Sequence, residues 1–93
     1  MPQQINEEVY EEMISALNTF CTNVSDSCSE MSNAATECMD NCEHDEASVK
    51  SYSRVNECVQ AFEKAVELAE KLAAAMNNEL EAAREQARKA DNI

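Results

Sequence analysis

The stretch Cys38-Met39-Asp40-Asn41-Cys42-Glu43-His44 holds the residues of this chain whose types and spacing could do chemistry. Two thiols stand four residues apart, and an imidazole follows shortly after the second. Thiolates at this spacing on one helix can share a soft ion such as Cu(I), and histidine is a common further ligand. Cys38, Cys42 and His44 are therefore a candidate site for Cu(I) or another soft metal.

The cysteines also admit a simpler interpretation, in which they pack as small hydrophobic residues. At about 100° per residue, four of them fall in one helical sector of about 100° with other apolar residues, so we expect them to face the core, and Cys58 likewise. Tetrahedral zinc normally uses two close pairs of ligands, and only one pair is present. Core packing is therefore the favoured interpretation, with a metal site or a disulfide as alternatives. The four are Cys21, Cys28, Cys38 and Cys42.

Catalytic chemistry has little support in this sequence. Glycine is absent, so the chain has no glycine-rich loop for phosphate, and it has no Cys–His–acid set outside the stretch above. The acidic pairs Glu7-Glu8 and Glu11-Glu12 are expected on a polar helix face, where nothing raises their pKa values enough for acid catalysis. We expect a binding or structural protein without enzymatic activity and without a cofactor.

The elements that must position these residues are predicted to be two long helices. Apolar residues recur at steps of three and four in both halves of the chain, which indicates amphipathic helices rather than strands. We expect an all-α antiparallel hairpin in a single domain, 1–93, with helices at about 5–43 and 48–90 and a join at 44–47.

Local signals refine this prediction. Asn6 is expected to cap the first helix, and Asp45 or Ser48 the second. Between Ser25 and Ser29 the first helix consists of weak helix formers, so a kink or break there is one expectation.

The charge is divided unevenly along the chain. The net charge is −12, and no Lys or Arg occurs before Lys50. An acidic surface of this kind repels nucleic acid and anionic membranes, and it attracts basic partners. The sequence also shows no signal peptide and no apolar segment of membrane-spanning length, so we expect no nucleic-acid partner and no membrane insertion. An acidic decoy that occupies the nucleic-acid site of a basic protein stays open as a further function.

A lone hairpin would leave part of its apolar surface in water unless a second hairpin packed on it to give a four-helix bundle. We therefore expect a helical protein partner, in a hetero- or homo-oligomer, bound through one apolar stripe. That stripe is predicted to consist of Val9, Met13, Leu17, Phe20, Val24, Phe62, Val66 and Leu72.

The whole chain resembles the WXG superfamily, the early-secreted-antigen-like helical hairpins of bacterial type VII secretion. The resemblance rests on the length, the two amphipathic helices, the acidic balance, the missing signal peptide and the tail from Glu81 to Ile93. More narrowly, the chain is similar to the small helical partner proteins of LXG toxins. This implies an adaptor or targeting chaperone that binds a helical domain of an export substrate. It also implies a place in the bacterial cytoplasm, or export without a cleavable signal.

Two family motifs are altered in this chain. The family's export motif places an aromatic residue four positions before an acid, and here Ala87 stands in the aromatic position before Asp91. The Trp-X-Gly turn is missing, because Trp and Gly are absent, and the segment from Glu43 to Ser48 would take its place. These departures leave open whether the chain carries an export signal or is the partner that lacks one.

Overall fold

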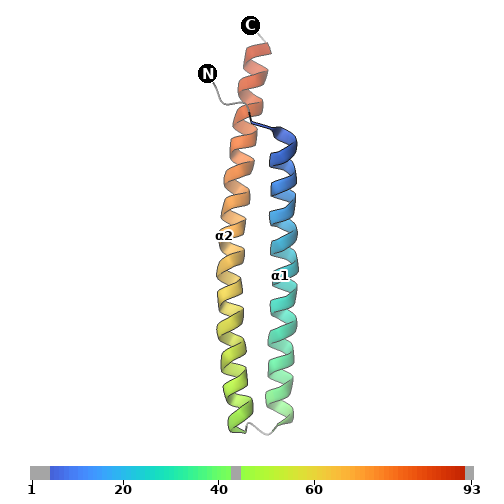
Figure 1. The fold of residues 1–93 in the computed structure, drawn as a ribbon, viewed down its shortest axis with the longest axis vertical. Coiled ribbons are helices and arrows are strands. Elements are labelled where there is room, and N and C mark those ends of the chain that lie inside the picture. Colours follow the sequence, from blue (N-terminus) through green and yellow to red (C-terminus); the bar gives the residue numbers. More distant parts are fainter. Residues whose placement is uncertain (1–4, 43–44, 92–93) are drawn as a thin grey trace.

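The computed structural model describes residues 5–42 and 45–91 and consists of two antiparallel helices. Helix α1 spans Glu7–Asn41 and helix α2 spans Glu46–Asp91. They lie side by side along the whole of α1, and α2 extends beyond its start (Figure 1). The molecule is a narrow rod of 73 × 17 × 15 Å. The prediction of an all-α helical hairpin is confirmed.

Both helices begin at a side chain that caps them. The Asn6 Oδ1 atom accepts a hydrogen bond from the backbone N–H of Val9 at 3.2 Å, and the Asp45 Oδ1 atom accepts one from the N–H of Ser48 at 2.7 Å. Each cap satisfies an N–H group that the first turn of a helix leaves unpaired. Because Asp45 rather than Ser48 is the second cap, α2 starts slightly earlier than the predicted residue 48.

Helix α1 continues without a break through the serine-rich stretch from Ser25 to Ser29. The expectation of an interruption there is wrong, because tertiary contacts outweigh the weak local propensity of these residues. Cys28 is buried within the stretch, and Val24, just before it, packs against the core. The burial of these two side chains against α2 holds the stretch in helical form.

The core is a thin seam between the two helices. From Val59 to Leu80, helix α2 contributes buried residues at steps of three, four and seven, which is the heptad spacing of helices that wind around each other. Among the described residues no side chain is completely inaccessible to solvent. A seam of this kind holds two helices together but leaves their flanks uncovered. The buried residues are Cys21 and Cys28 on α1, and Ser48, Val59, Val66, Ala69, Ala73 and Leu80 on α2.

Candidate partner-binding face

One side of the hairpin carries large apolar side chains that remain exposed. Their exposed fractions run from 41% for Phe20 to 52% for Val9. With about 100° of rotation per residue, each of these side chains is displaced in the same direction around its helix from the buried residues of that helix. In an antiparallel pair, the same displacement on both helices brings both sets of side chains to one side of the hairpin. We call this surface the apolar face, and it consists of Val9, Met13 and Phe20 on α1 and Phe62 and Leu72 on α2.

A groove confirms that the two helices contribute to the same side. It has a volume of about 300 Å³ and is lined by residues of α1 together with Phe62 of α2. Ser27 is the only lining residue with a hydroxyl, so the groove is almost entirely apolar. It is suited to receive a large side chain from another helix, as a hole receives a knob in a coiled coil. Its other lining residues are Val24, Cys28 and Met31.

The remaining residues of the predicted stripe belong to the hairpin's own seam. Val66 is buried and forms a cluster with Cys21 and Ala69, against which Leu17 and Val24 pack. The Cys21 Sγ atom lies 3.7 Å from the carbonyl oxygen of Val66, to which its S–H donates. Val66 is therefore covered by α1 and is not offered to a partner, whereas Leu17 and Val24 form the half-buried edge of the apolar face.

The opposite side of the hairpin is mainly polar, although the exposed Val49 of α2 lies toward it. A groove of about 620 Å³ on this side is lined mainly by residues with hydroxyl, amide and charged side chains, among them Ser15, Asn18, Thr22 and Asn77. A second groove on this side is lined by serines of α1 and by Glu63 of α2. The hairpin thus has two unlike sides, and the apolar face is the one on which large apolar side chains predominate.

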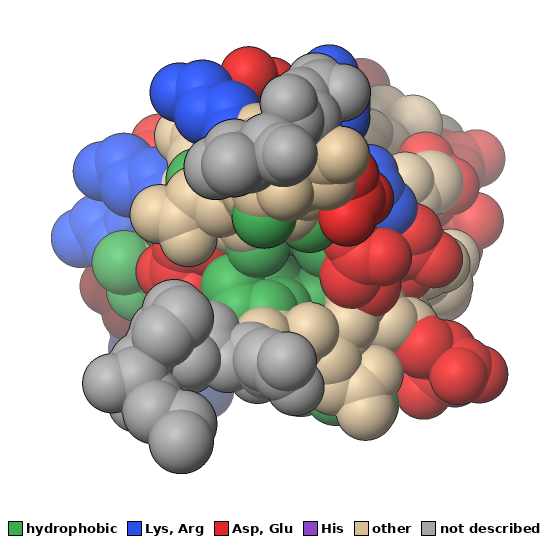
Figure 2. All heavy atoms as spheres, turned by 90° about the horizontal axis from the view of Figure 1, so that it is seen from above, with side chains coloured by type: hydrophobic (Ala, Val, Ile, Leu, Met, Phe, Trp, Pro, Cys, Tyr) green, Lys and Arg blue, Asp and Glu red, His purple; other side chains and the backbone are tan. Residues whose placement is uncertain are grey.

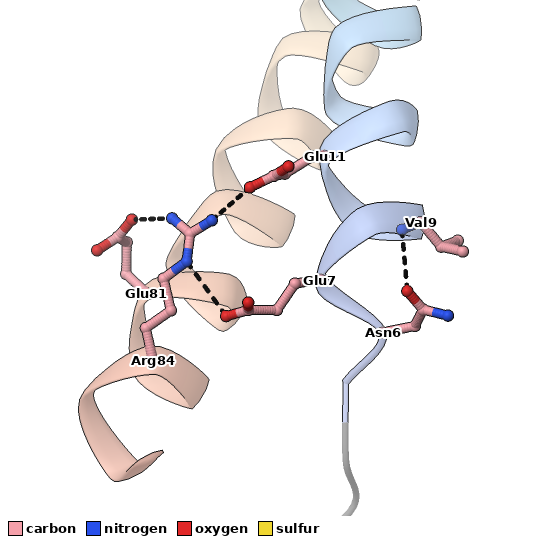
Figure 3. A network of polar contacts seen from close by, with 6 residues as sticks. All are labelled: Asn6, Glu7, Val9, Glu11, Glu81 and Arg84. Carbon is pink, nitrogen blue, oxygen red and sulfur yellow. Dashed lines mark hydrogen bonds and ion pairs between the residues drawn. The ribbon is translucent and has the colours of Figure 1, made fainter. Parts of the chain in front are cut away.

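A polar network joins the helices at the open end of the hairpin (Figure 3). The Nε atom of Arg84 on α2 lies 3.2 Å from the Glu7 carboxylate, its Nη2 atom pairs with Glu11, and its Nη1 atom lies 3.1 Å from Glu81. Nearby, the Tyr10 hydroxyl donates to Glu79 at 2.9 Å, and this bond raises the pKa of Tyr10. The network fixes α1 against α2 close to Val9.

Positive and negative side chains are distributed unequally between the two helices. Viewed along the rod, hydrophobic side chains lie between the helices, Lys and Arg gather mainly on the left, and Asp and Glu crowd the right (Figure 2). All Lys and Arg residues of the chain lie on α2. A partner that covers the α1 half of the apolar face therefore meets a purely acidic rim.

The structure divides the cysteines. Cys21 and Cys28 are buried, as expected, but Cys38, Cys42 and Cys58 are exposed, so the prediction that all five face the core is wrong. Met39 lies five helical turns of about 3.6 residues after Cys21, so it points in the same direction as Cys21, toward α2. Cys38, one residue earlier, is therefore rotated away from α2 by roughly a quarter of a turn. Cys42 lies beyond the last residue of α1. On α2, the buried position next to Cys58 belongs to Val59.

The structure brings Cys38 and Cys42 together at the closed end of the hairpin. Their Sγ atoms are 4.0 Å apart, and the hydrogen bond and charge of Cys42 raise the pKa of Cys38. His44, the third residue of the predicted set, lies outside the described residues. Within 5–42 and 45–91, no group of three or more Cys, His, Asp or Glu side chains is placed to hold a metal ion.

Ala87 and Asp91, which the resemblance to the WXG superfamily compares with an export motif, lie one turn apart near the end of α2, and both are exposed. This part of α2 projects past the start of α1 (Figure 1). Ala87 presents only a methyl group where the family pattern has an aromatic ring. The structure therefore places the two residues on an accessible helix end without an apolar anchor.

Comparisons with protein-family models, curated proteins and solved structures found no match. The function must therefore be argued from the surface of the molecule itself. In the part of the chain that the structure describes, no helix is both long and apolar enough to cross a membrane.

Proposed function

We propose that this chain is a non-enzymatic helical adaptor that binds a helical domain of another protein through its apolar face. The observation that carries this proposal is the two-sided surface, on which five large apolar side chains are exposed together on one side. Removing apolar area from water favours association, and the free energy gained has to exceed the cost of ordering the two proteins. Two partner helices on this face would complete a four-helix bundle, in which the flanks of the thin seam are also covered.

The charge favours a partner of a different kind over a second copy of the chain. Each chain carries a net charge of −12, so two copies repel each other when their α1 helices approach. A partner with Lys and Arg at the rim of its apolar surface would instead be attracted and correctly oriented. We therefore infer a heteromeric complex with a helical domain that has a basic rim.

The resemblance to the WXG superfamily supplies a narrower form of the proposal. In this form the partner is the helical domain of a type VII secretion substrate of the LXG-toxin kind, and the chain is its targeting chaperone in the bacterial cytoplasm. The hairpin shape and the acidic charge support it. With Ala87 in the aromatic position, the chain fits the role of the partner that lacks a complete export signal.

The test is co-expression with candidate helical domains taken from the genes beside this chain's own, followed by size exclusion with light scattering. We expect one complex of the two proteins, weakened by Phe20→Lys and by Phe62→Lys. Thr22→Lys is the matched control, because Thr22 lies on the same helix as Phe20 but lines the polar groove.

Two results would contradict the proposal in different ways. A complex that tolerates both Phe substitutions but dissociates in salt, or when Glu7, Glu8, Glu11 and Glu12 become Gln, would indicate the acidic decoy instead. Absence of any complex with the neighbouring helical domain would reject the type VII assignment.

A further inference from the structure

We propose that Cys38 and Cys42 form a binding site for one soft monovalent cation, with Cu(I) as its type, at the closed end of the hairpin. Both thiols are exposed; Cys38 lies in the last turn of α1, and Cys42 is the residue that directly follows the helix. Their Sγ atoms are already 4.0 Å apart. This site is independent of the apolar face and does not rest on the adaptor function.

The sulfur separation suits an ion that bridges the two thiols. Metal–thiolate bonds are about 2.3 Å long for zinc, so an ion of similar size can contact two sulfurs 4.0 Å apart with both bonds near their normal length. A disulfide requires the sulfurs to approach to about 2.05 Å, which is much closer than the observed separation. The observed arrangement therefore fits a bridging ion more closely than a disulfide.

The chemistry of the ligands selects the kind of ion. Both ligands are thiols, whereas calcium and magnesium require several oxygen ligands. Thiolates prefer soft ions such as Cu(I), which accepts two sulfur ligands.

The charge of the surroundings also favours a cation. Helix α1 contains no Lys or Arg, and Asp40 and Asp45 lie close to the pair in sequence. On binding, each thiol releases its proton and each sulfur forms one bond to the ion, so that one Cu(I) and two thiols give a bis-thiolate complex of charge −1 and two protons. The acidic environment attracts the incoming ion.

The experiment is an anaerobic competition between the reduced protein and the coloured Cu(I) chelator bicinchoninate. We expect the chain to withhold one Cu(I) per molecule from the chelator while remaining a single species on size exclusion. Cys38→Ser and Cys42→Ser should each lose this binding. Cys58→Ser is the matched control, because it removes an exposed thiol elsewhere on the hairpin. Circular dichroism shows whether each variant keeps its helices.

Several outcomes would overturn the proposal. They are failure of the folded wild-type chain to compete with the chelator, retention of copper by the folded Cys38→Ser variant, and loss of copper in Cys58→Ser. Binding of Zn(II) as tight as that of Cu(I) would reject the two-ligand assignment, because it would require further ligands. Copper-dependent dimerisation would show that the ion is shared between chains instead.

Discussion

Leu72 and Leu80 lie on the same helix in opposite surroundings, since Leu72 is 50% exposed and Leu80 is 3% exposed. Replacing Leu80 by Ala leaves a cavity in the seam and should lower the free energy of unfolding by about 2–4 kcal/mol. Leu72→Ala should change it by no more than about 0.5 kcal/mol, as is usual for surface positions. Urea unfolding followed by circular dichroism measures both.

The two leucine variants also separate stability from binding. Leu72→Ala should weaken the complex with a helical partner while the free chain keeps its stability, because Leu72 belongs to the apolar face. Equal destabilisation by the two substitutions in the free chain would show that Leu72 is already covered in solution.

The free energy of unfolding should depend on pH through the titration of Asp45. Hydrogen bonds from the backbone and side chain of Ser48 lower the pKa of Asp45 below its ordinary value of 3.8. Since the folded-state pKa is the lower one, the stabilisation is present above pH 3.8 and is lost as the pH falls through the folded-state value. Asp45→Asn keeps a capping oxygen that does not titrate in this range.

We therefore expect the difference in Tm between wild type and Asp45→Asn to shift in favour of the variant on acidification below pH 3.8. Thermal unfolding over a pH series measures it. Asp26→Asn is the control, because Asp26 is an exposed aspartate in the middle of α1. A parallel pH response of the two variants would show that the cap does not contribute.

At the scale of the elements, Arg84 decides how the open end of the hairpin is held. It is the residue that joins α2 to Glu7 and Glu11 on α1, whereas Arg88 pairs only with Glu85 of its own helix. We expect Arg84→Gln to accelerate amide hydrogen exchange in the first turns of α1, and Arg88→Gln to leave it unchanged.

Salt provides a second check on this network. Added salt should accelerate the same amides in the wild-type chain, because the ion pairs are partly exposed and screened. Equal protection of these amides in both variants would show that the seam and the Tyr10–Glu79 hydrogen bond fix α1 at this end without Arg84.

At the scale of the whole molecule, the apolar face favours association between copies of the chain, whereas the net charge of −12 opposes it. We expect the free chain at low salt to have the light-scattering mass of one molecule and to elute early on size exclusion, because the rod is 73 Å long and 17 Å wide. High salt screens the repulsion and should promote self-association. Phe62→Lys should suppress that association, and Glu63→Lys on the polar side should not. A salt-independent dimer would contradict the inference that charge prevents pairing of copies.

The local elements were predictable because their causes are local. The steps of three and four follow from the helical period, and Asn6 and Asp45 cap through hydrogen bonds to residues three positions away. The uneven charge of the two halves is likewise a property of the chain itself. These features were sufficient to predict an acidic helical hairpin.

The predicted apolar stripe separates into buried and exposed residues, and this separation could be seen only in the tertiary structure. It depends on how each helix is rotated about its axis relative to the other. A single sequence places Leu72 and Ala73 in neighbouring sectors, and only packing against α1 decides that Ala73 is buried and Leu72 exposed. The same rotation brings Met39 inward in place of Cys38.

Arg84 was missed for a related reason. Its partners are separated from it by most of the chain, and the antiparallel register alone brings them together. The sequence by itself determined the helices, the Asn6 cap and the balance of charge, since these depend on residues within a few turns. The tertiary structure decided which side chains share a face, because that depends on contacts between distant segments.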